Sequence, residues 1–269
     1  MFLELENLST HFTDRKGNVL KAVDEVTLSV EKGEILGLVG ESGCGKSTLS
    51  RTVMQLIPPT SGRVTLDGVD FTSLSRAELR KARLDFQMIF QDPYASLNPR
   101  MTVASTLAEA VRTRHPKLEG DALTRHVAEL MAKCGLDPLA LRKYPHEFSG
   151  GQRQRIAIAR ALAPEPKLLM ADEPVSALDV SIQSQILNLL KSLVRELGLT
   201  MIFVSHDLSV VRYISDRIAV MHFGKIIEVN AANALMDSPQ HPYTRTLLQA
   251  IPRIDVPAIK RRLRAAPAA

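Results

Sequence analysis

The chain has 269 residues, of which 45% are hydrophobic, 23% are charged and only 4% are aromatic. This balance excludes disordered, fibrous and disulfide-rich proteins, and the length predicts one large domain or a core with a small companion. No uncharged run approaches the roughly 18–20 apolar residues that span a bilayer, and the first residues lack the layout of a signal peptide. We therefore expect a protein that stays in the cytoplasm.

The formal net charge of +5 lies mostly in one short segment. Residues 253–269 hold five basic residues and one acidic residue, which leaves +1 for the rest of the chain. Because no basic stripe follows a predicted helix, we expect no nucleic-acid partner, and we interpret 253–269 as a short basic Ala/Pro tail that is solvated or lies beside a membrane. Cys44 and Cys134 form no C-x-x-C pair, which suggests neither a zinc site nor a disulfide.

The predicted elements change in kind along the chain. Residues 2–30 alternate apolar and polar side chains around a turn at Gly17-Asn18, which predicts an antiparallel strand region. Later strands are short, continuous apolar runs, typical of a parallel sheet that is buried on both faces. These runs are residues 35–39, 168–171, 201–204 and 218–221. Helical spacing between them, as in 186–197 before Gly198, completes an α/β pattern.

A helical segment interrupts the strands between the Asn98-Pro99 and Tyr144-Pro145 turns. One helical pattern runs from Thr102 to about Thr113, and a second has Cys134 on its apolar face. That spacing favours a packed core thiol at Cys134 over a reactive one. The sequence therefore predicts an α/β fold with an antiparallel edge region and an inserted helical subdomain at about residues 95–150.

Residues 40–48 read GESGCGKST and satisfy the phosphate-binding pattern G-x-x-x-x-G-K-[ST], the P-loop. They follow an apolar strand and open a helix that we expect to end at Pro58-Pro59. Glycines let backbone N–H groups curl around phosphate oxygens, and the helix N-terminus adds its positive dipole end. We expect Lys46 to reach the β- and γ-phosphates and Ser47 to bind Mg²⁺. The predicted nucleotide contacts are Gly40, Glu41, Ser42, Gly43, Cys44, Gly45, Lys46, Ser47 and Thr48, with Cys44 acting only through its backbone.

An acidic pair, Asp172 and Glu173, follows the apolar run at 168–171. Two carboxylates at the end of a buried strand are costly to desolvate without a cation nearby, which favours a functional site over a pair of ordinary surface residues. We expect Asp172 to act on Mg²⁺, through water, and Glu173 to orient or deprotonate the attacking water. In-line attack on the γ-phosphate needs little beyond such positioning and charge stabilisation.

Residues 148–155 read FSGGQRQR and resemble the signature motif of ABC ATPases. Ser149, Gly150, Gly151 and Gln152 open a predicted helix, where a hydroxyl and paired glycines would form a second anion-binding site. Taken alone, the same residues would be a simple N-capped helix, because serine is a good cap.

The resemblance covers about residues 3–250 and implies a P-loop NTPase core with roles for further residues. Gln91 resembles the Q-loop glutamine that senses Mg²⁺ and water, Asp179 lies in a segment that resembles the D-loop at the dimer seam, and His206 resembles the switch histidine that contacts the γ-phosphate. Without the other motifs, Gln91 would be explained equally well as an ordinary surface amide, and His206 as an ordinary histidine in a loop. Phe12 matches the position of the adenine-stacking aromatic, although a phenylalanine on an edge strand is often core.

Within this family the chain resembles ATP-binding subunits of oligopeptide and dipeptide permeases, the peptide/nickel import group, at residues 90–99, 172–179 and 238–248. The resemblance implies ATP and Mg²⁺ as cofactors and an ATPase domain over residues 1–252. It also implies two transmembrane permease subunits, an extracytoplasmic substrate-binding protein and a peripheral position on the cytoplasmic face of the cell (inner) membrane.

A second ATP-binding subunit, either a paralogue or a copy of this chain, is expected in a head-to-tail dimer. In it, ATP would lie between Lys46 of one subunit and Ser149 of the other. Nickel, opine or sugar-conjugate cargo stay open as alternatives to peptides. Two hypotheses from other functional classes also stay open. One is a soluble ABC-type ATPase that acts on DNA or ribosomes, and the other is a regulatory module that binds nucleotide without hydrolysing it.

Overall fold

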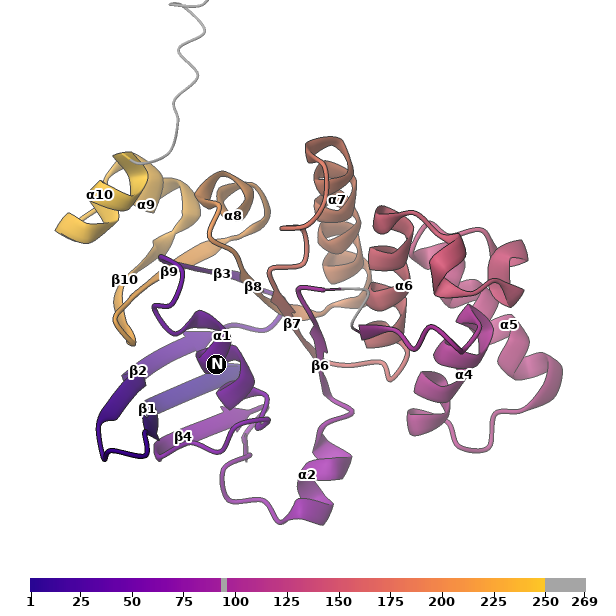
Figure 1. The fold of residues 1–269 in the computed structure, drawn as a ribbon, viewed down its shortest axis with the longest axis horizontal. Helices are drawn as coiled ribbons and strands as arrows, with labels where there is room; N and C mark the ends of the chain where they lie inside the picture. The colour runs from indigo at the N-terminus through magenta and orange to yellow at the C-terminus, as the bar shows by residue number, and fades with distance from the viewer. Residues whose placement is uncertain (93–95, 250–269) are drawn as a thin grey trace, which may run out of the picture.

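The computed structural model describes residues 1–92 and 96–249, in which the strands form two sheets (Figure 1). Residues 93–95, which belong to the segment 90–99, and the predicted tail 253–269 lie outside the described residues.

The first sheet is antiparallel and has the strand order β2-β1-β4-β5. Strand β1 pairs with β2 on one side, where Leu3 lies opposite Val30, and with β4 on the other, where Leu3 lies opposite Leu66. The predicted antiparallel region is therefore confirmed and is extended by two strands beyond residue 30. The strands are β1 (Leu3–Thr13), β2 (Val19–Val30), β4 (Ser61–Leu66) and β5 (Val69–Asp70).

The second sheet has the order β10-β9-β3-β8-β7-β6 and confirms the four apolar runs as strands. Strands β9, β3, β8, β7 and β6 run parallel to one another, and β10 closes one edge antiparallel to β9. The strands are β3 (Ile35–Val39), β6 (Phe86–Ile89), β7 (Leu168–Asp172), β8 (Thr200–Val204), β9 (Arg217–His222) and β10 (Lys225–Ala231).

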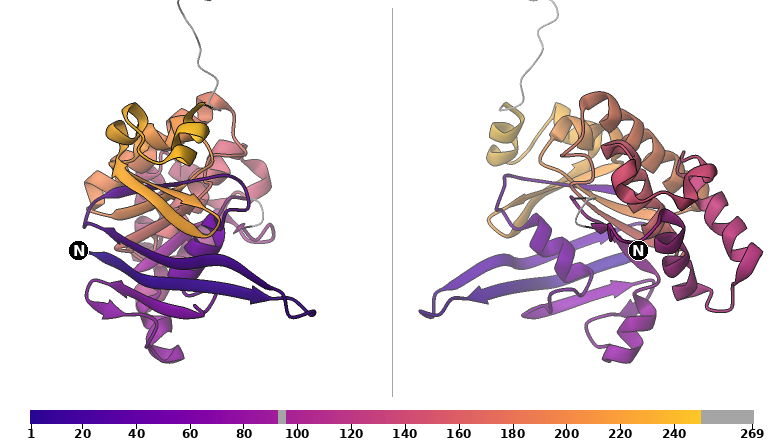
Figure 2. Two further views of the ribbon diagram at one scale, coloured as in Figure 1. Left: turned by 90° about the vertical axis from the view of Figure 1, so that its left-hand side faces the viewer. Right: turned by 45° about the vertical axis from the view of Figure 1, so that its right-hand side comes forward.

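Period-two alternation sends each parallel strand into two hydrophobic cores. In β8, Met201 and Phe203 join the core beneath the long helices, whereas Ile202 and Val204 join the core shared with the antiparallel sheet. Both faces are apolar because both are covered, which is why these strands read as continuous hydrophobic runs. Figure 2 shows the antiparallel sheet as a separate layer, with α1 (Lys46–Val53) between the two sheets, where it contacts β1, β2 and β7.

Helix α1 ends earlier than the sequence predicts. Its last residue is Val53, not the residue before Pro58-Pro59. Gln55 has a positive φ of 52°, and the N–H groups of Leu56 and Ile57 turn back to the carbonyl of Arg51. The chain must leave the helix here because the N–H of Thr60 bonds to the carbonyl of Ser9 and starts the approach to β4.

Helix α2 packs against the core shared with the antiparallel sheet, whereas the later helices cover the other face of the parallel sheet and extend beyond its edge (Figure 1). Helix α4 begins one residue after Thr102, the first residue of the predicted pattern, which serves as its N-cap, and α7 ends before Gly198, which has a positive φ. Cys134 is fully buried, and burial raises the pKa of its thiol to about 12, which confirms a packed thiol. The helices are α2 (Arg76–Ala82), α4 (Val103–Arg114), α5 (Gly120–Lys133), η1 (Pro138–Arg142), η2 (Pro145–Glu147), α6 (Gly150–Leu162), α7 (Val180–Leu197), α8 (Leu208–Ile214), α9 (Ala232–Asp237) and α10 (Pro242–Gln249).

The helical insertion predicted from the sequence corresponds to α4, α5, η1 and η2, which lie between β6 and α6 in the chain and at the right in Figure 1. Within residues 1–92 and 96–249, no helix is both long enough and apolar enough to cross a bilayer.

Candidate active site

A cleft of about 580 Å³ opens where four neighbouring strands of the parallel sheet end. The P-loop follows β3, Glu173 follows β7, His206 follows β8, and Gln91 follows β6. Parallel strands present their carboxyl ends at one edge, so four segments that are distant in sequence meet there. All four, together with Phe12, line the cleft. The structure thus brings together most of the nucleotide and catalytic residues that the sequence predicts.

The P-loop is closed around its own lysine. The Nζ atom of Lys46 donates to the carbonyl oxygens of Gly40 at 2.7 Å and Glu41 at 2.8 Å, and the side chain is buried. Gly45 has a φ of 111°, and a Cβ there would lie 2.0 Å from the carbonyl oxygen of Ala22. Only glycine fits this position, so the turn that directs the N-terminus of α1 into the cleft is set by sequence.

Ser47 and Asp172 form a pair at the floor of the site. The Ser47 hydroxyl donates to Asp172 Oδ1 at 3.2 Å, which joins α1 to β7. Burial raises the pKa of the Asp172 carboxyl above its ordinary value and the charge of Glu173 adds to this, whereas the Ser47 bond and the charges of Arg51 and Lys46 lower it. The buried carboxylate is therefore short of positive charge, which a bound cation would supply.

The donor set fits Mg²⁺ held jointly with phosphates. A serine hydroxyl and a carboxylate oxygen are the hard oxygen ligands that this ion prefers, and it commonly takes one or two protein ligands and fills the rest with phosphates and water. Among the described residues, no cluster of three or more His, Cys, Asp and Glu side chains is placed to hold a metal ion by itself. The pair therefore suits a cation that arrives with a polyphosphate.

The Glu173 carboxylate is held at both oxygens. Gln91 Nε2 donates to Oε2 at 2.9 Å, and His206 Nδ1 lies 3.2 Å from Oε1. Glu173 itself has a φ of 48°, an unusual value outside glycine, and its N–H bonds to the carbonyl of Val204 on β8. Three strands thus fix one side chain that faces the cleft, as expected for a group that must be aimed at a reacting water.

The outer wall of the cleft is apolar. Phe12, 42% exposed, lies opposite Leu20 in the β1–β2 pair, and both line the cleft. Phe223, 80% exposed, lines it from the turn between β9 and β10. Sequence reasoning found Phe12 but missed Leu20 and Phe223, because neither belongs to a motif. An exposed apolar wall beside a phosphate-binding loop is suited to a nucleobase.

The signature residues and Asp179 do not line this cleft. Ser149 Oγ accepts from the N–H of Gln152 at 3.3 Å, and Gln152 Oε1 accepts from the N–H of Ser149 at 3.0 Å, so the two form a capping box on α6. Gly151 packs against Ile182, where a Cβ would lie 2.5 Å from Cγ2, and Asp179 precedes α7 beside them. These residues form a separate cluster at the N-termini of α6 and α7.

A P-loop, a hydroxyl–carboxylate pair suited to Mg²⁺ and a fixed glutamate around one cleft define a P-loop nucleoside triphosphatase. Comparison with known proteins places the chain within this class. Residues 23–176 match the model of the ABC transporter family, and residues 227–268 match the model described as oligopeptide/dipeptide transporter, C-terminal region. The chain belongs to the ABC transporter family and is one of its ATPases.

Individual relatives agree with this assignment. The chain is 51% identical to the oligopeptide transport ATP-binding protein OppF of Salmonella typhimurium over 94% of this chain and 78% of the relative. It is 52% identical to AppF of Bacillus subtilis, also named an oligopeptide transport ATP-binding protein, over 93% of this chain and 78% of the relative.

Solved structures share the fold. A dimeric ATP-binding cassette, MJ0796, described in a post-hydrolysis state bound to ADP and Pi, matches with a TM-score of 0.77 and 31% identity over 86% of this chain and 98% of that one. The cbiO1 protein of Clostridium perfringens matches with a TM-score of 0.79 and 28% identity over 98% of both chains.

Replacing Asp172 by asparagine tests whether its charge is strained. A carboxyl whose folded pKa lies above its unfolded value destabilises the fold once the pH rises through that folded value. Asp172→Asn removes the charge and keeps an oxygen for Ser47. Without Mg²⁺ and nucleotide, we expect the melting temperature at pH 7 to rise by about 2–4 °C, and the gain to shrink as the pH falls.

Calorimetric scans at several pH values measure this difference. Asp237→Asn, which changes a carboxylate on the exposed side of α9, is the matched control and should leave the melting temperature unchanged. A lower melting temperature for Asp172→Asn at pH 7 would contradict the interpretation, because it would mean that Arg51, Lys46 and Ser47 already satisfy the carboxylate.

Proposed function

We propose that the chain is the ATP-hydrolysing subunit of an importer for oligopeptides or dipeptides, bound peripherally at the cytoplasmic face of the cell membrane. The observation that carries the cargo class is the match of residues 227–268 to the oligopeptide/dipeptide transporter C-terminal region, in a chain about half identical to two oligopeptide transport ATP-binding proteins. The cleft supplies the chemistry that such a subunit needs.

In the proposed mechanism, the backbone N–H groups of the P-loop and the Lys46 ammonium bind the β- and γ-phosphates, while Phe12 stacks on the base. Ser47 and, through water, Asp172 would hold Mg²⁺, which would neutralise phosphate charge. Glu173 accepts a proton from the attacking water. Gln91 and His206 keep its carboxylate aimed, and His206, more than half exposed, is placed to reach the γ-phosphate.

The cleft requires a second subunit to be complete. It has donors on the P-loop side, whereas Ser149, Gly150, Gly151, Gln152 and Asp179 lie at a separate cluster of the same chain. Two chains packed head to tail would bring the signature helix of one onto the nucleotide of the other. The dimeric cassette that shares this fold supports that arrangement.

A groove of about 630 Å³ offers a docking place for the permease. It lies between the turn after α1, strand β6 and helices α4 and α6, and its lining includes Leu56, Phe90 and Met101 with Arg83 and Glu109. Phe90 directly precedes Gln91, which bonds to Glu173. A cytoplasmic segment of a transmembrane subunit seated here would therefore touch the residue next to Gln91, which positions the catalytic Glu173, and this suits coupling of hydrolysis to transport.

Replacing Glu173 by glutamine tests the catalytic assignment. The substitution keeps the shape and a hydrogen-bonding oxygen, but the amide cannot accept a proton. We expect ATP to bind with an affinity close to that of the wild type and steady-state hydrolysis, measured with the partner subunits present, to fall by about 100-fold or more. Glu165→Gln, on the surface beside His115, should hydrolyse normally. Near-normal turnover by Glu173→Gln would remove this residue from the catalytic role.

Replacing Leu56 by aspartate tests the docking groove. Docking of an apolar segment would bury the new carboxylate, which is unfavourable. Tagged Leu56→Asp should therefore recover much less of the two permease subunits from detergent-solubilised membranes than the wild type does. ATP binding should be unchanged. Leu139→Asp, at a leucine 92% exposed on η1, is the control. Equal recovery of the permease by both variants would contradict the location of the groove.

Uptake tests the cargo. In host cells that lack this gene, plasmid-borne wild type should restore accumulation of a labelled tripeptide, whereas Glu173→Gln should not. Recovery of the extracytoplasmic binding protein and a second ATPase with the tagged chain would complete the set of partners. Restored uptake of nickel, an opine or a sugar conjugate with no effect on peptides would overturn the peptide assignment while leaving the ATPase assignment intact.

A further inference from the structure

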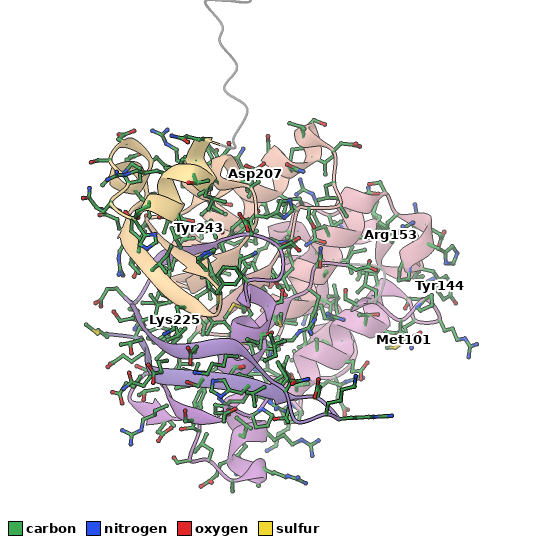
Figure 3. The ribbon with its side chains drawn as sticks, turned by 60° about the vertical axis from the view of Figure 1, so that its left-hand side comes forward. Met101, Tyr144, Arg153, Asp207, Lys225 and Tyr243 are labelled. Carbon is green, nitrogen blue, oxygen red and sulfur yellow. The ribbon has the colours of Figure 1, made fainter. Side chains whose placement is uncertain are left out.

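The C-terminal helix α10 reaches the nucleotide cleft through one side chain, Tyr243. The Tyr243 hydroxyl accepts a hydrogen bond from the N–H of Glu41 in the P-loop at 3.2 Å, across 202 residues of sequence. Its ring stacks on His222 at the end of β9, with centroids 3.7 Å apart and planes at 29°. Figure 3 shows Tyr243 beside the β9–β10 hairpin, which reaches the cleft at Phe223.

The peptide group between Gly40 and Glu41 connects this tyrosine to the P-loop lysine. Its N–H donates to Tyr243, and its carbonyl, that of Gly40, accepts from Lys46 Nζ at 2.7 Å. A peptide group is planar, so its N–H and C=O directions cannot be changed independently. The hydroxyl that fixes one end therefore fixes the direction of the carbonyl that binds the lysine.

Tyr243 is itself firmly placed. The Glu228 carboxylate on β10 accepts from the N–H groups of Gln240 and His241, each at 2.9 Å, and His241 Nδ1 accepts from the N–H of Tyr243 at 3.1 Å. The two bonds to Glu228 hold the start of α10 against the hairpin, and the third fixes the first turn of the helix. The tyrosine oxygen thus sits on a fixed support and does not rely on a mobile surface side chain.

We propose that Tyr243 is a positioning residue for nucleotide binding, which holds Lys46 in register with the phosphates through the Gly40–Glu41 peptide. The inference rests on the proposed role of Lys46 as a phosphate ligand. It makes the C-terminal helix part of the nucleotide site, so that whatever moves α10 changes the affinity for ATP.

Tyr243→Phe removes only the hydroxyl and keeps the ring on His222. We expect the dissociation constant for ATP, measured by titration with a fluorescent ATP analogue, to rise about three- to tenfold, the effect of losing one hydrogen bond. The KM for ATP should rise with it, kcat at saturating ATP should stay within about twofold, and the melting temperature should fall by no more than about 2–4 °C. Tyr213→Phe, which removes a hydroxyl that bonds Asn188 away from the cleft, should leave affinity unchanged.

A double-mutant cycle with Lys46→Ala separates this inference from the one beneath it. Because Tyr243 acts through Lys46, Tyr243→Phe should weaken ATP binding no further in the Lys46→Ala background. Wild-type affinity in the single Tyr243→Phe variant would overturn the inference, and so would an equal loss in both backgrounds. Lys46→Ala that binds ATP normally would instead overturn the phosphate-ligand role on which the inference rests.

Discussion

The carboxyl ends of β3, β8, β7 and β6 meet at one edge of the parallel sheet, and the rest of the site depends on that meeting. Each strand is followed by a residue or loop that would have no chemistry alone: the P-loop, His206, Glu173 and Gln91. The sheet order places the P-loop strand β3 and the acidic strand β7 on either side of β8. A phosphate chain bound by the P-loop and a water beside Glu173 would therefore lie in the same cleft. Hydrophobic burial on both faces makes this edge rigid.

The same arrangement explains why buried charge is tolerated at the floor of the cleft. Asp172 ends a fully buried strand, and burial raises its pKa, yet Ser47, Lys46 and Arg51 lie close enough to oppose the shift. Such partial compensation is expected of a site whose remaining positive charge comes with the substrate. Glu173, one residue further on, bonds to two side chains from neighbouring strands and faces the open cleft. Adjacent carboxylates thus acquire different environments and different roles.

How far the sequence predicts the site depends on how local each feature is. The P-loop and the Asp172-Glu173 pair can be recognised from the sequence because a strand, a turn and a helix start are encoded within about ten residues. Phe223 and Tyr243 cannot be recognised in this way. Phe223 faces the cleft only because a hairpin turns there, and Tyr243 meets Glu41 only after the whole sheet has formed. The early end of α1 at Val53 was missed for a similar reason, because pairing of Thr60 with Ser9 sets it.

The fold also separates what one chain does from what two chains do. Ser149 caps its own helix, so the sequence predicts its local structure correctly. In the proposed dimer, an anion-binding role at that helix start would need a nucleotide brought by another subunit. The antiparallel sheet supplies Phe12 and Leu20 to the cleft, whereas Ser149 and Asp179 lie outside its lining, at the starts of α6 and α7. In the proposed dimer, closure of the two subunits would depend on ATP, and motion of the helical part would reach the proposed docking groove.

The most direct test of this account is the structure of Glu173→Gln solved with Mg²⁺ and ATP, together with the ATPase subunit that purifies with it. We predict the γ-phosphate within hydrogen-bonding distance of Lys46 Nζ, Mg²⁺ at Ser47, and the signature helix of the second subunit on the opposite side of the phosphate. ATP bound by one chain alone, with the residues around Ser149 of both subunits facing solvent, would contradict the composite site on which the account rests.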